Sequence, residues 1–355
     1  MNSFLFDKKL KYMKNFPTCP LCSCDTATQI WKASCSEQAS HFLSPLVNRD
    51  KYEELKEHIC CLQKSSFISL NKCSACNFIY SFPNCAGDKK FYDLIFSDTN
   101  KYPQDRWEFM KSIEIIKNSK FTNPTILEIG SGDGAFIRKL VKQRITKKNS
   151  ITAIEYSIYG KSKIKDFGIE CLSIDIKDNK NKLPHKKYDF ICLFQVLEHL
   201  DDIHNLVARL KNLLSINGEI LIAVPNDKII EFNELNGALL DMPPNHIGRW
   251  SKKTFIKYCD LNNISLLDHK VEPFSFKRFL LMFYSYRFLR KAQKQNSIAA
   301  YIKYKLNKNL TSIFIIIFII TDLLFSPKVL LKIIFSAAKL GGETQLARIS
   351  KACNN

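Results

Sequence analysis

A glycine-rich loop near the middle of the chain has the residue types and spacing of a ligand-binding site. An apolar run from Ile126 to Ile129 contains Glu128 and leads into Gly130-Ser131-Gly132-Asp133-Gly134. Glycines let the backbone turn sharply and approach a ligand, and the following helix offers free N–H donors. The run also fits the dinucleotide fingerprint G-x-G-x-x-G/A, with Ala135 in the last place. A tight turn with no ligand is the simplest alternative.

Two acidic residues follow the next two expected strands. Glu155 stands about twenty residues beyond the loop, where a carboxylate can accept hydrogen bonds from two ribose hydroxyls. Asp175 follows the third strand, where a carboxylate could accept from an adenine amino group. Either residue alone is best explained as a solvated strand end. In series behind the glycine loop, they indicate a ligand.

The run after the fourth expected strand, Phe194-Gln-Val-Leu-Glu198-His199-Leu-Asp-Asp, completes a recognisable series. With the loop and both acids, it resembles the class I S-adenosylmethionine-dependent methyltransferases over roughly residues 124–272. The resemblance implies that S-adenosylmethionine is bound by a set of residues around the strand ends. Its methionine part would be surrounded by the loop residues Glu128, Gly130, Ser131, Gly132 and Gly134. Its ribose and adenine would be bound by Glu155, Tyr156, Asp175 and Ile176, and Gln195 would lie beside its sulfonium.

Two histidines are candidates for a general base, which a hydroxyl or carbon-acid nucleophile requires. His246 lies in a Pro-rich loop after the fifth expected strand, together with Arg249 and Trp250. We expect His246 to act as the base and Arg249 to bind a substrate anion. The alternative is a loop histidine that only stabilises its turn. His199 is the second candidate, with ordering of the following helix as its alternative role.

Two CxxC pairs, Cys19 with Cys22 and Cys73 with Cys76, offer four thiolates for a closed structural zinc site. Other residues could substitute or form a second site: Cys24, Cys35, Cys60, Cys61, Cys85, His41 and His58. Buried thiols without metal are the alternative. A CxxC…CxxC module before a methyltransferase core is similar to the sugar C-methyltransferases. Their tyrosine motif and doubled histidine are not clearly present, so transfer to oxygen is favoured over carbon.

The elements that position these residues follow a βαβ rhythm, which predicts a doubly wound, Rossmann-like α/β sheet. Apolar, β-branched runs predict six strands, and four amphipathic stretches predict helices: strands 125–129, 151–155, 170–174, 190–194, 219–224 and 264–269; helices 135–144, 157–167, 203–213 and 252–262. Residues 341–350 resemble the seventh, antiparallel strand of the methyltransferase sheet.

Composition divides the 355 residues into four zones, and the resemblance of residues 341–350 to a last strand divides the fourth zone in two. We expect a zinc-ribbon-like module at 1–88, a helical connector at 89–122, the methyltransferase core at 123–272, a helical insertion at 273–340, and the last strand and tail at 341–355. Nine of the 13 cysteines precede residue 86, and the first sixteen residues are too charged for a signal peptide. A reducing cytoplasm is therefore expected, with metal binding rather than disulfides.

The carboxyl-terminal insertion is basic and then apolar. From Lys277 to Lys308 there are nine basic residues and no acidic one, within a net charge of +19. The uncharged run from Leu310 to Thr321 is too short to span a bilayer. Residues 275–338 are therefore expected to lie on a membrane surface, with packing against a partner or the core as alternatives.

Together these patterns predict an S-adenosylmethionine-dependent methyltransferase for a small or lipid-linked acceptor, a saccharide or related anionic metabolite. Nucleic-acid methylation is an alternative prompted by the charge. It is disfavoured because the run at Phe194 lacks the polar-Pro-Pro-aromatic motif of enzymes that methylate base amino groups. A non-catalytic scaffold that binds membrane and a partner is the alternative from another class.

Overall fold

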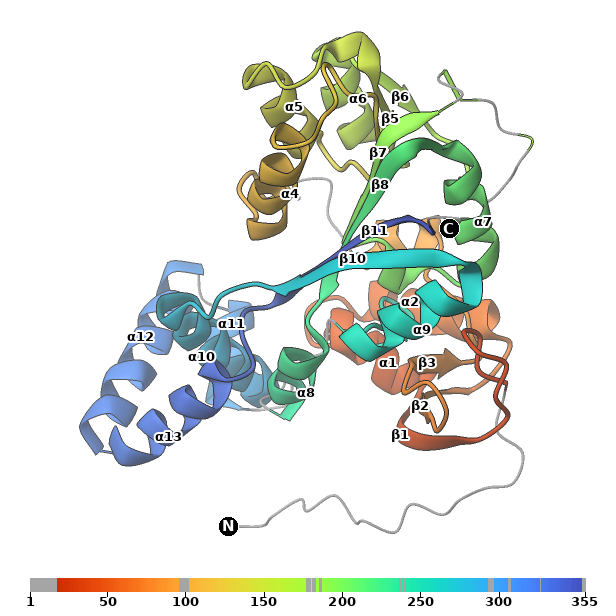
Figure 1. Ribbon diagram of the computed structural model, residues 1–355. Helices are drawn as coiled ribbons and strands as arrows, with labels where there is room; N and C mark the ends of the chain where they lie inside the picture. The colour runs from red at the N-terminus through yellow and green to blue at the C-terminus, as the bar shows by residue number, and fades with distance from the viewer. Residues whose placement is uncertain are drawn as a thin grey trace.

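A computed structural model describes residues 18–95, 102–176, 180, 183–184, 187–235, 238, 241–292, 297–305, 308–325 and 327–352. Within this part of the chain, seven strands form one central sheet in the order β10-β11-β8-β7-β4-β5-β6 (Figure 1). Their bounds are Ile264–Val271, Thr344–Lys351, Leu214–Pro225, Tyr188–Phe194, Ile126–Ile129, Ile151–Ile154 and Glu170–Leu172. The strands from β8 to β6 are parallel, and β11 lies antiparallel between β8 and β10. The expected doubly wound α/β sheet is confirmed.

Helices cover both faces of this sheet, which explains why its inner strands β4, β5 and β7 are buried and mostly apolar. Along β7, Phe190 and Cys192 belong to the cluster under one face, and Ile191 and Leu193 belong to the cluster under the other. The first face is covered by α4 (Trp107–Lys117), α5 (Ala135–Lys142) and α6 (Ile158–Asp166); the second by α7 (Ile203–Leu213) and α9 (Lys252–Asn262). Short 3-10 turns, η1 (Lys148–Ser150) and η2 (Leu197–His199), precede β5 and α7.

The amino-terminal module contains a second sheet, which includes one strand from the core. Its described strands are β1 (Ala27–Ser34), β2 (Phe67–Cys73) and β3 (Ile79–Phe82), and they accompany α1 (Cys35–Phe42), α2 (Arg49–Gln63) and α3 (Lys89–Ile95). The fourth strand, β9 (Gly248–Arg249), comes from the loop after β8 and pairs with β3. Module residues Phe78 and Tyr80 share one apolar cluster with Trp250 and Tyr258 of the core. The module is therefore built onto the core through a common interior.

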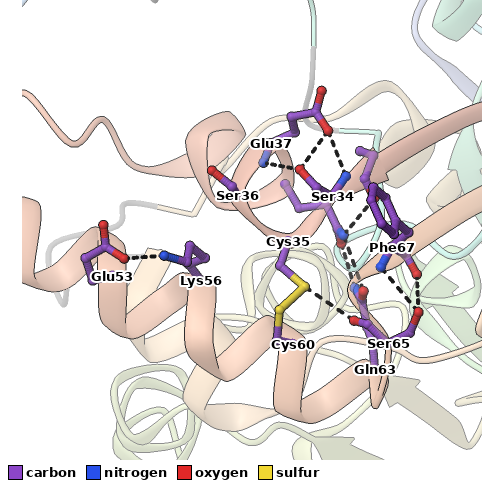
Figure 2. Close-up of a disulfide and its surroundings, with 12 residues drawn as sticks. Ser34, Cys35, Ser36, Glu37, Glu53, Lys56, Cys60, Gln63, Ser65 and Phe67 are labelled. Atoms are coloured by element: carbon purple, nitrogen blue, oxygen red, sulfur yellow. Dashed lines mark hydrogen bonds and ion pairs between the residues drawn. A yellow bond between two sulfur atoms is a disulfide. The ribbon is translucent and has the colours of Figure 1, made fainter.

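A disulfide joins Cys35, at the start of α1, to Cys60 on α2 (Figure 2). The Cys35 sulfur also lies 3.4 Å from the carbonyl oxygen of Ser65. This pair differs from the expectation that the clustered cysteines would remain thiols or metal ligands. The sequence does not show it, because the two cysteines meet only after α1 and α2 pack against each other.

Between β10 and β11 the described residues form a group of helices at one end of the sheet (Figure 1). These are α10 (Phe276–Ala292), α11 (Ile298–Lys305), α12 (Lys308–Phe325) and α13 (Pro327–Ala338). Phe279, Phe283, Leu330, Ile334 and Ala337 form the centre of their apolar cluster. They lie beside α8 (Asp227–Leu235), whose residue Phe232 packs on Phe279. Among the described residues, none of the helices has both the length and the apolar character that crossing a membrane requires.

Candidate active site

The glycine loop after β4 adopts the backbone conformation that its sequence requires. Gly130, Gly132 and Gly134 have φ angles of 71°, 54° and 80°, in the left-handed region that side chains with a Cβ disfavour. A Cβ atom on Gly132 would also lie 2.8 Å from the ring of Tyr102. Gly134 then begins α5. The loop is therefore fixed by its own residues at the carboxyl edge of the sheet.

Glu155, directly after β5, is hydrogen-bonded to the backbone of this loop. Its Oε2 accepts a hydrogen bond from the N–H of Gly132, and its Oε1 accepts one from the N–H of Ser157, both at 2.7 Å. The residue is only 9% exposed. Each carboxylate oxygen keeps capacity for a further hydrogen bond, which is what a ribose diol would need.

A cavity opens beside the loop. Six of the residues expected to bind the cofactor line it: Glu128, Gly130, Ser131, Gly132, Glu155 and Gln195. Residues that the sequence did not single out also line it, among them Tyr102, Arg106, Asp133 and Phe194. Tyr102 and Arg106 precede or begin α4, and no local pattern connects them with the loop about thirty residues later.

Two buried carboxylate oxygens at this cavity have no hydrogen-bond partner within the described part of the chain: Glu128 Oε2 and Asp133 Oδ1. Burial raises the pKa of Glu128 well above its usual range, and the Glu155 charge adds to the effect. Asp133 is held in place by Gln104, whose Nε2 donates to its Oδ2 at 2.7 Å. Unpaired acceptors in a cavity are the arrangement that a ligand with a cationic amino group completes. The residues present therefore fit the methionine end of S-adenosylmethionine.

Four of the expected cofactor residues do not line the described cavity. Gly134 contacts Ile164 and caps α5. Tyr156 is 60% exposed, and its hydroxyl donates to the carbonyl oxygen of Ile174 at 2.7 Å. Asp175 is exposed and Ile176 is buried, both just beyond β6. The roles of these four residues stay predictions.

Gly160, on the first turn of α6, is a further residue that the sequence did not indicate. A Cβ atom there would lie 2.3 Å from the carbonyl oxygen of Gly132. In the sequence it is only a glycine near the start of a helix. Its importance becomes visible only when the glycine loop packs against α6. Gly160 therefore lets α6 approach the cofactor loop.

His199 and His246 lie side by side, with ring centroids 4.6 Å apart. His246 is fixed by Asp241, whose Oδ1 accepts from Nδ1 at 3.0 Å. Burial opposes protonation of His246, but the Asp241 hydrogen bond and charge outweigh it and raise the pKa of His246. For His199, burial lowers the pKa to about 3. The Nδ1 of His199 lies 2.6 Å from the carbonyl oxygen of Asn245 and 2.9 Å from the Tyr92 hydroxyl.

Arg249 lies close to this pair but is already engaged. It forms a buried, two-pronged ion pair with Glu234 through NH1 and NH2. Its guanidinium therefore has a structural partner in the described chain. Binding of a substrate anion by Arg249 stays a prediction.

The amino-terminal module positions the loop that carries His246. The N–H of Ser81 donates to the carbonyl oxygen of Ile247, and the N–H of Gly87 donates to that of Pro244, both at 2.9 Å. These bonds flank His246 on both sides and extend the β3–β9 pairing. The module therefore helps to hold the loop that carries His246.

The four cysteines of the CxxC pairs come together in this module. All four sulfur atoms lie within 4.8 Å of one another, and Cys19–Cys76 and Cys22–Cys73 are separated by 3.7 and 3.5 Å. Zn–S bonds of about 2.3 Å in a tetrahedron place sulfur atoms about 3.8 Å apart. A hydrogen bond from Cys76 lowers the pKa of Cys19 to about 5, despite burial. The site thus has the donor set and the size that zinc requires.

Comparison with known proteins agrees with this geometry. The family described as "Methyltransferase domain" matches residues 101–268. Malonyl-[acyl-carrier protein] O-methyltransferase 1 of Ilyobacter polytropus is 28% identical over 182 residues, which are 50% of this chain and 66% of that protein. The match thus spans just under two thirds of the relative's length.

Solved structures with a similar fold include a SAM-dependent methyltransferase from Archaeoglobus fulgidus and coclaurine N-methyltransferase. The first has a TM-score of 0.41 and 16% identity, and the match covers 68% of this chain and 91% of that one. The second has a TM-score of 0.41 and 13% identity, with 71% and 74% covered. Identities this low carry no information about the acceptor.

Proposed function

We propose that residues 101–268, which match the methyltransferase-domain family, form a class I S-adenosylmethionine-dependent methyltransferase domain, and that the protein methylates a small or lipid-linked acceptor. The proposed acceptor is a saccharide or related anionic metabolite, methylated on oxygen. The observation that carries the proposal is the cavity above the glycine loop with its two unpaired, buried carboxylate oxygens. The O-methyltransferase named above and the net charge of +19 favour an oxygen nucleophile and an anionic acceptor.

The cofactor residues act by binding and orienting. Glu128 and Asp133 would pair with the amino group of the methionine part, and Glu155 with the ribose hydroxyls. When bound, S-adenosylmethionine supplies a methyl group already activated by its sulfonium, so alignment of the nucleophile provides much of the rate. Gln195, at the end of β7, would separate the cofactor cavity from the acceptor side.

The acceptor is proposed to lie against the two histidines beyond Gln195. Nδ1 of His246 is occupied by its hydrogen bond to Asp241, so Nε2 of His246 is the ring nitrogen that would face the acceptor. The sequence-based expectation gives His246 the role of general base. His199 is covered by Tyr92 of α3 and by the backbone of Asn245. This packing would keep water from the transferred methyl group.

Transfer itself is tested with methyl-labelled S-adenosylmethionine and a panel of nucleotide-linked, lipid-linked and free anionic saccharides. We expect label in one acceptor class, attached to oxygen by NMR of the product. A product labelled on carbon would correct the nucleophile. Label in RNA or DNA, falling steeply with salt, would overturn the acceptor class.

We also propose that Cys19, Cys22, Cys73 and Cys76 bind structural zinc. The support is the sulfur geometry above and the absence of an open ligand position in a four-sulfur set. Metal analysis of protein purified without chelator should give about one zinc per chain, and Cys73→Ser should lose it. Cys61→Ser, which changes an exposed thiol outside the cluster, is the control. No zinc in the wild type would contradict the proposal.

Finally, we propose that α12 and α13 contact the surface of a membrane. One face of α12 is exposed and apolar with helical spacing: Ile313, Ile316, Ile317, Ile320 and Leu324 are 49–69% exposed. Leu331 and Phe335 of α13 are also exposed. The opposite side of α12, with Ile315 and Ile319, packs on the helical cluster. Arg287 and Arg290 of α10 would favour anionic lipids.

Co-sedimentation with vesicles of anionic and zwitterionic lipid tests this contact. Binding to anionic vesicles should fall at least tenfold in the double variant Ile317→Glu/Leu324→Glu. Ile216→Glu is the matched control, because Ile216 is 88% exposed on β8 and outside the helical group. Equal binding of both variants would contradict the proposal.

A further inference from the structure

Three potential metal ligands converge at the acceptor side of the site. Glu198, His199 and His246 offer ligand atoms that all lie within 4.8 Å of one another. His199 Nε2 is 4.0 Å from Glu198 Oε1. We propose that these three residues bind a divalent transition-metal ion, which holds the oxygen of the acceptor. The binding site stands on its own geometry, whereas its catalytic role rests on the proposed methyl transfer.

The two histidines are held in the tautomer that metal binding needs. His199 Nδ1 faces the carbonyl oxygen of Asn245 at 2.6 Å, so this nitrogen carries the proton and Nε2 carries the lone pair. His246 Nδ1 faces Asp241 Oδ1 at 3.0 Å, with the same result. Metal-ligating histidines are held in this way by a carbonyl or carboxylate on the other ring nitrogen. Both imidazoles therefore already have such outer partners.

Glu198 is the observation that points to a bound ion. Its side chain is 2% exposed, and neither carboxylate oxygen has a hydrogen-bond partner in another residue of the described chain. A buried carboxylate without partners is costly, and such groups are normally paired or bound to metal. A cation between Glu198 and the two imidazoles would satisfy it. Two imidazoles and one carboxylate suit Mn²⁺, Fe²⁺ or Zn²⁺, and they leave coordination positions open.

The place of the cluster explains what the ion would do. Gln195 lines the cofactor cavity, and Glu198 follows three residues later in η2. An acceptor hydroxyl bound to the ion would lose its proton more readily, because a bound cation lowers the pKa of a coordinated oxygen. His246 would then serve as a metal ligand rather than as the general base expected from the sequence, and the proton of the acceptor hydroxyl would pass to solvent water as the acceptor binds, before methyl transfer.

The test is a titration of zinc-loaded, full-length protein with Mn²⁺, followed by calorimetry and by the electron paramagnetic resonance signal of free Mn²⁺. The four-cysteine site does not compete, because thiolates select softer ions. We expect about one Mn²⁺ per chain, with affinity at least tenfold weaker in Glu198→Gln and in His246→Gln. His58→Gln is the matched control, because His58 pairs with Asp88 and is not among the ligands of either proposed metal site.

S-adenosylhomocysteine binding is measured on the same samples to separate the two proposals. Intact binding of S-adenosylhomocysteine with no Mn²⁺ uptake by the wild type would overturn the metal site and leave the methyltransferase proposal standing. Equal Mn²⁺ affinity in wild type and Glu198→Gln would also overturn it. Melting temperatures identify a variant that fails to fold, in which case the second variant decides.

Discussion

The Glu155 carboxylate accepts a hydrogen bond from the backbone N–H of Gly132, 2.7 Å from its Oε2. This bond links the end of β5 to the glycine loop after β4, across the register in which Ile129 pairs with Ile154. One carboxylate thus sets the shape of the loop and faces the cavity in which a ribose would lie. Two motifs that are separate in sequence form one binding unit.

Gly160→Ala should weaken S-adenosylhomocysteine binding more than tenfold. The added methyl group would lie 2.3 Å from the carbonyl oxygen of Gly132, so either α6 or the glycine loop must move. Calorimetry measures the effect, with Ser162→Ala, an exposed change on the same helix, as control. Unchanged affinity in Gly160→Ala would show that the loop does not depend on this contact.

Gly248→Ala should lower the rate of methyl transfer about tenfold and leave cofactor affinity unchanged. A Cβ atom on Gly248 would lie 2.9 Å from the ring of Phe78, which disturbs the β3–β9 pairing and the neighbouring His246. The measurement compares turnover and S-adenosylhomocysteine affinity in the same preparation. A parallel loss of both would mean that the module supports the whole fold rather than the acceptor side.

Breaking the disulfide with Cys60→Ala should destabilise the amino-terminal module by roughly 3 kcal/mol, as expected for a cross-link closing a loop of this length. The bond spans 25 residues between α1 and α2. Mass spectrometry should find Cys35 and Cys60 protected from alkylation until reductant is added, and urea unfolding gives the energy. Cys61→Ala, on the exposed side of α2, should change little. Rapid alkylation of Cys35 in the folded, unreduced protein would contradict the pairing.

The module should also lose stability in acid because of His41. Burial lowers the pKa of His41 to about 4, although the Glu37 charge acts against it. The unfolded chain therefore takes up the proton first. Stability is full above about pH 6.5 and is lost as the pH falls towards 4, by about 2 kcal/mol between pH 7.5 and pH 5.

Urea unfolding of wild type and His41→Phe at these two pH values isolates that contribution. His41 packs between Trp31 and Phe42, so phenylalanine preserves the apolar contacts. The variant should lose about 2 kcal/mol less than the wild type over this range. An identical pH dependence of the two proteins would show that His41 is not the group responsible.

Features set by local sequence could be predicted, and features set by distant contacts could not. The strands and the glycine loop follow from apolar runs and from glycines with positive φ, which act over a few residues. The place of β11 required the resemblance to a known sheet. Tyr102 above Gly132, and Tyr92 beside His199, come from segments with no pattern of their own.

The same distinction applies to the acceptor side of the site. The sequence indicated His199, His246 and Arg249 as separate candidates, but not the ion pair of Arg249 with Glu234. Glu198 was visible in the sequence only as part of a family motif. Its buried, unpaired carboxylate appears only when η2 packs beneath the His246 loop, through the bond from the N–H of Ile247 to the carbonyl oxygen of Glu198.

The central claim is that the cavity beside Glu155 binds S-adenosylmethionine. Its most direct test is calorimetric titration of the wild type and of Glu155→Gln with S-adenosylmethionine and S-adenosylhomocysteine. We predict micromolar binding at one site per chain, weakened at least a hundredfold by the substitution, with equal melting temperatures. A wild-type protein that is folded and zinc-loaded but binds neither compound would contradict the claim.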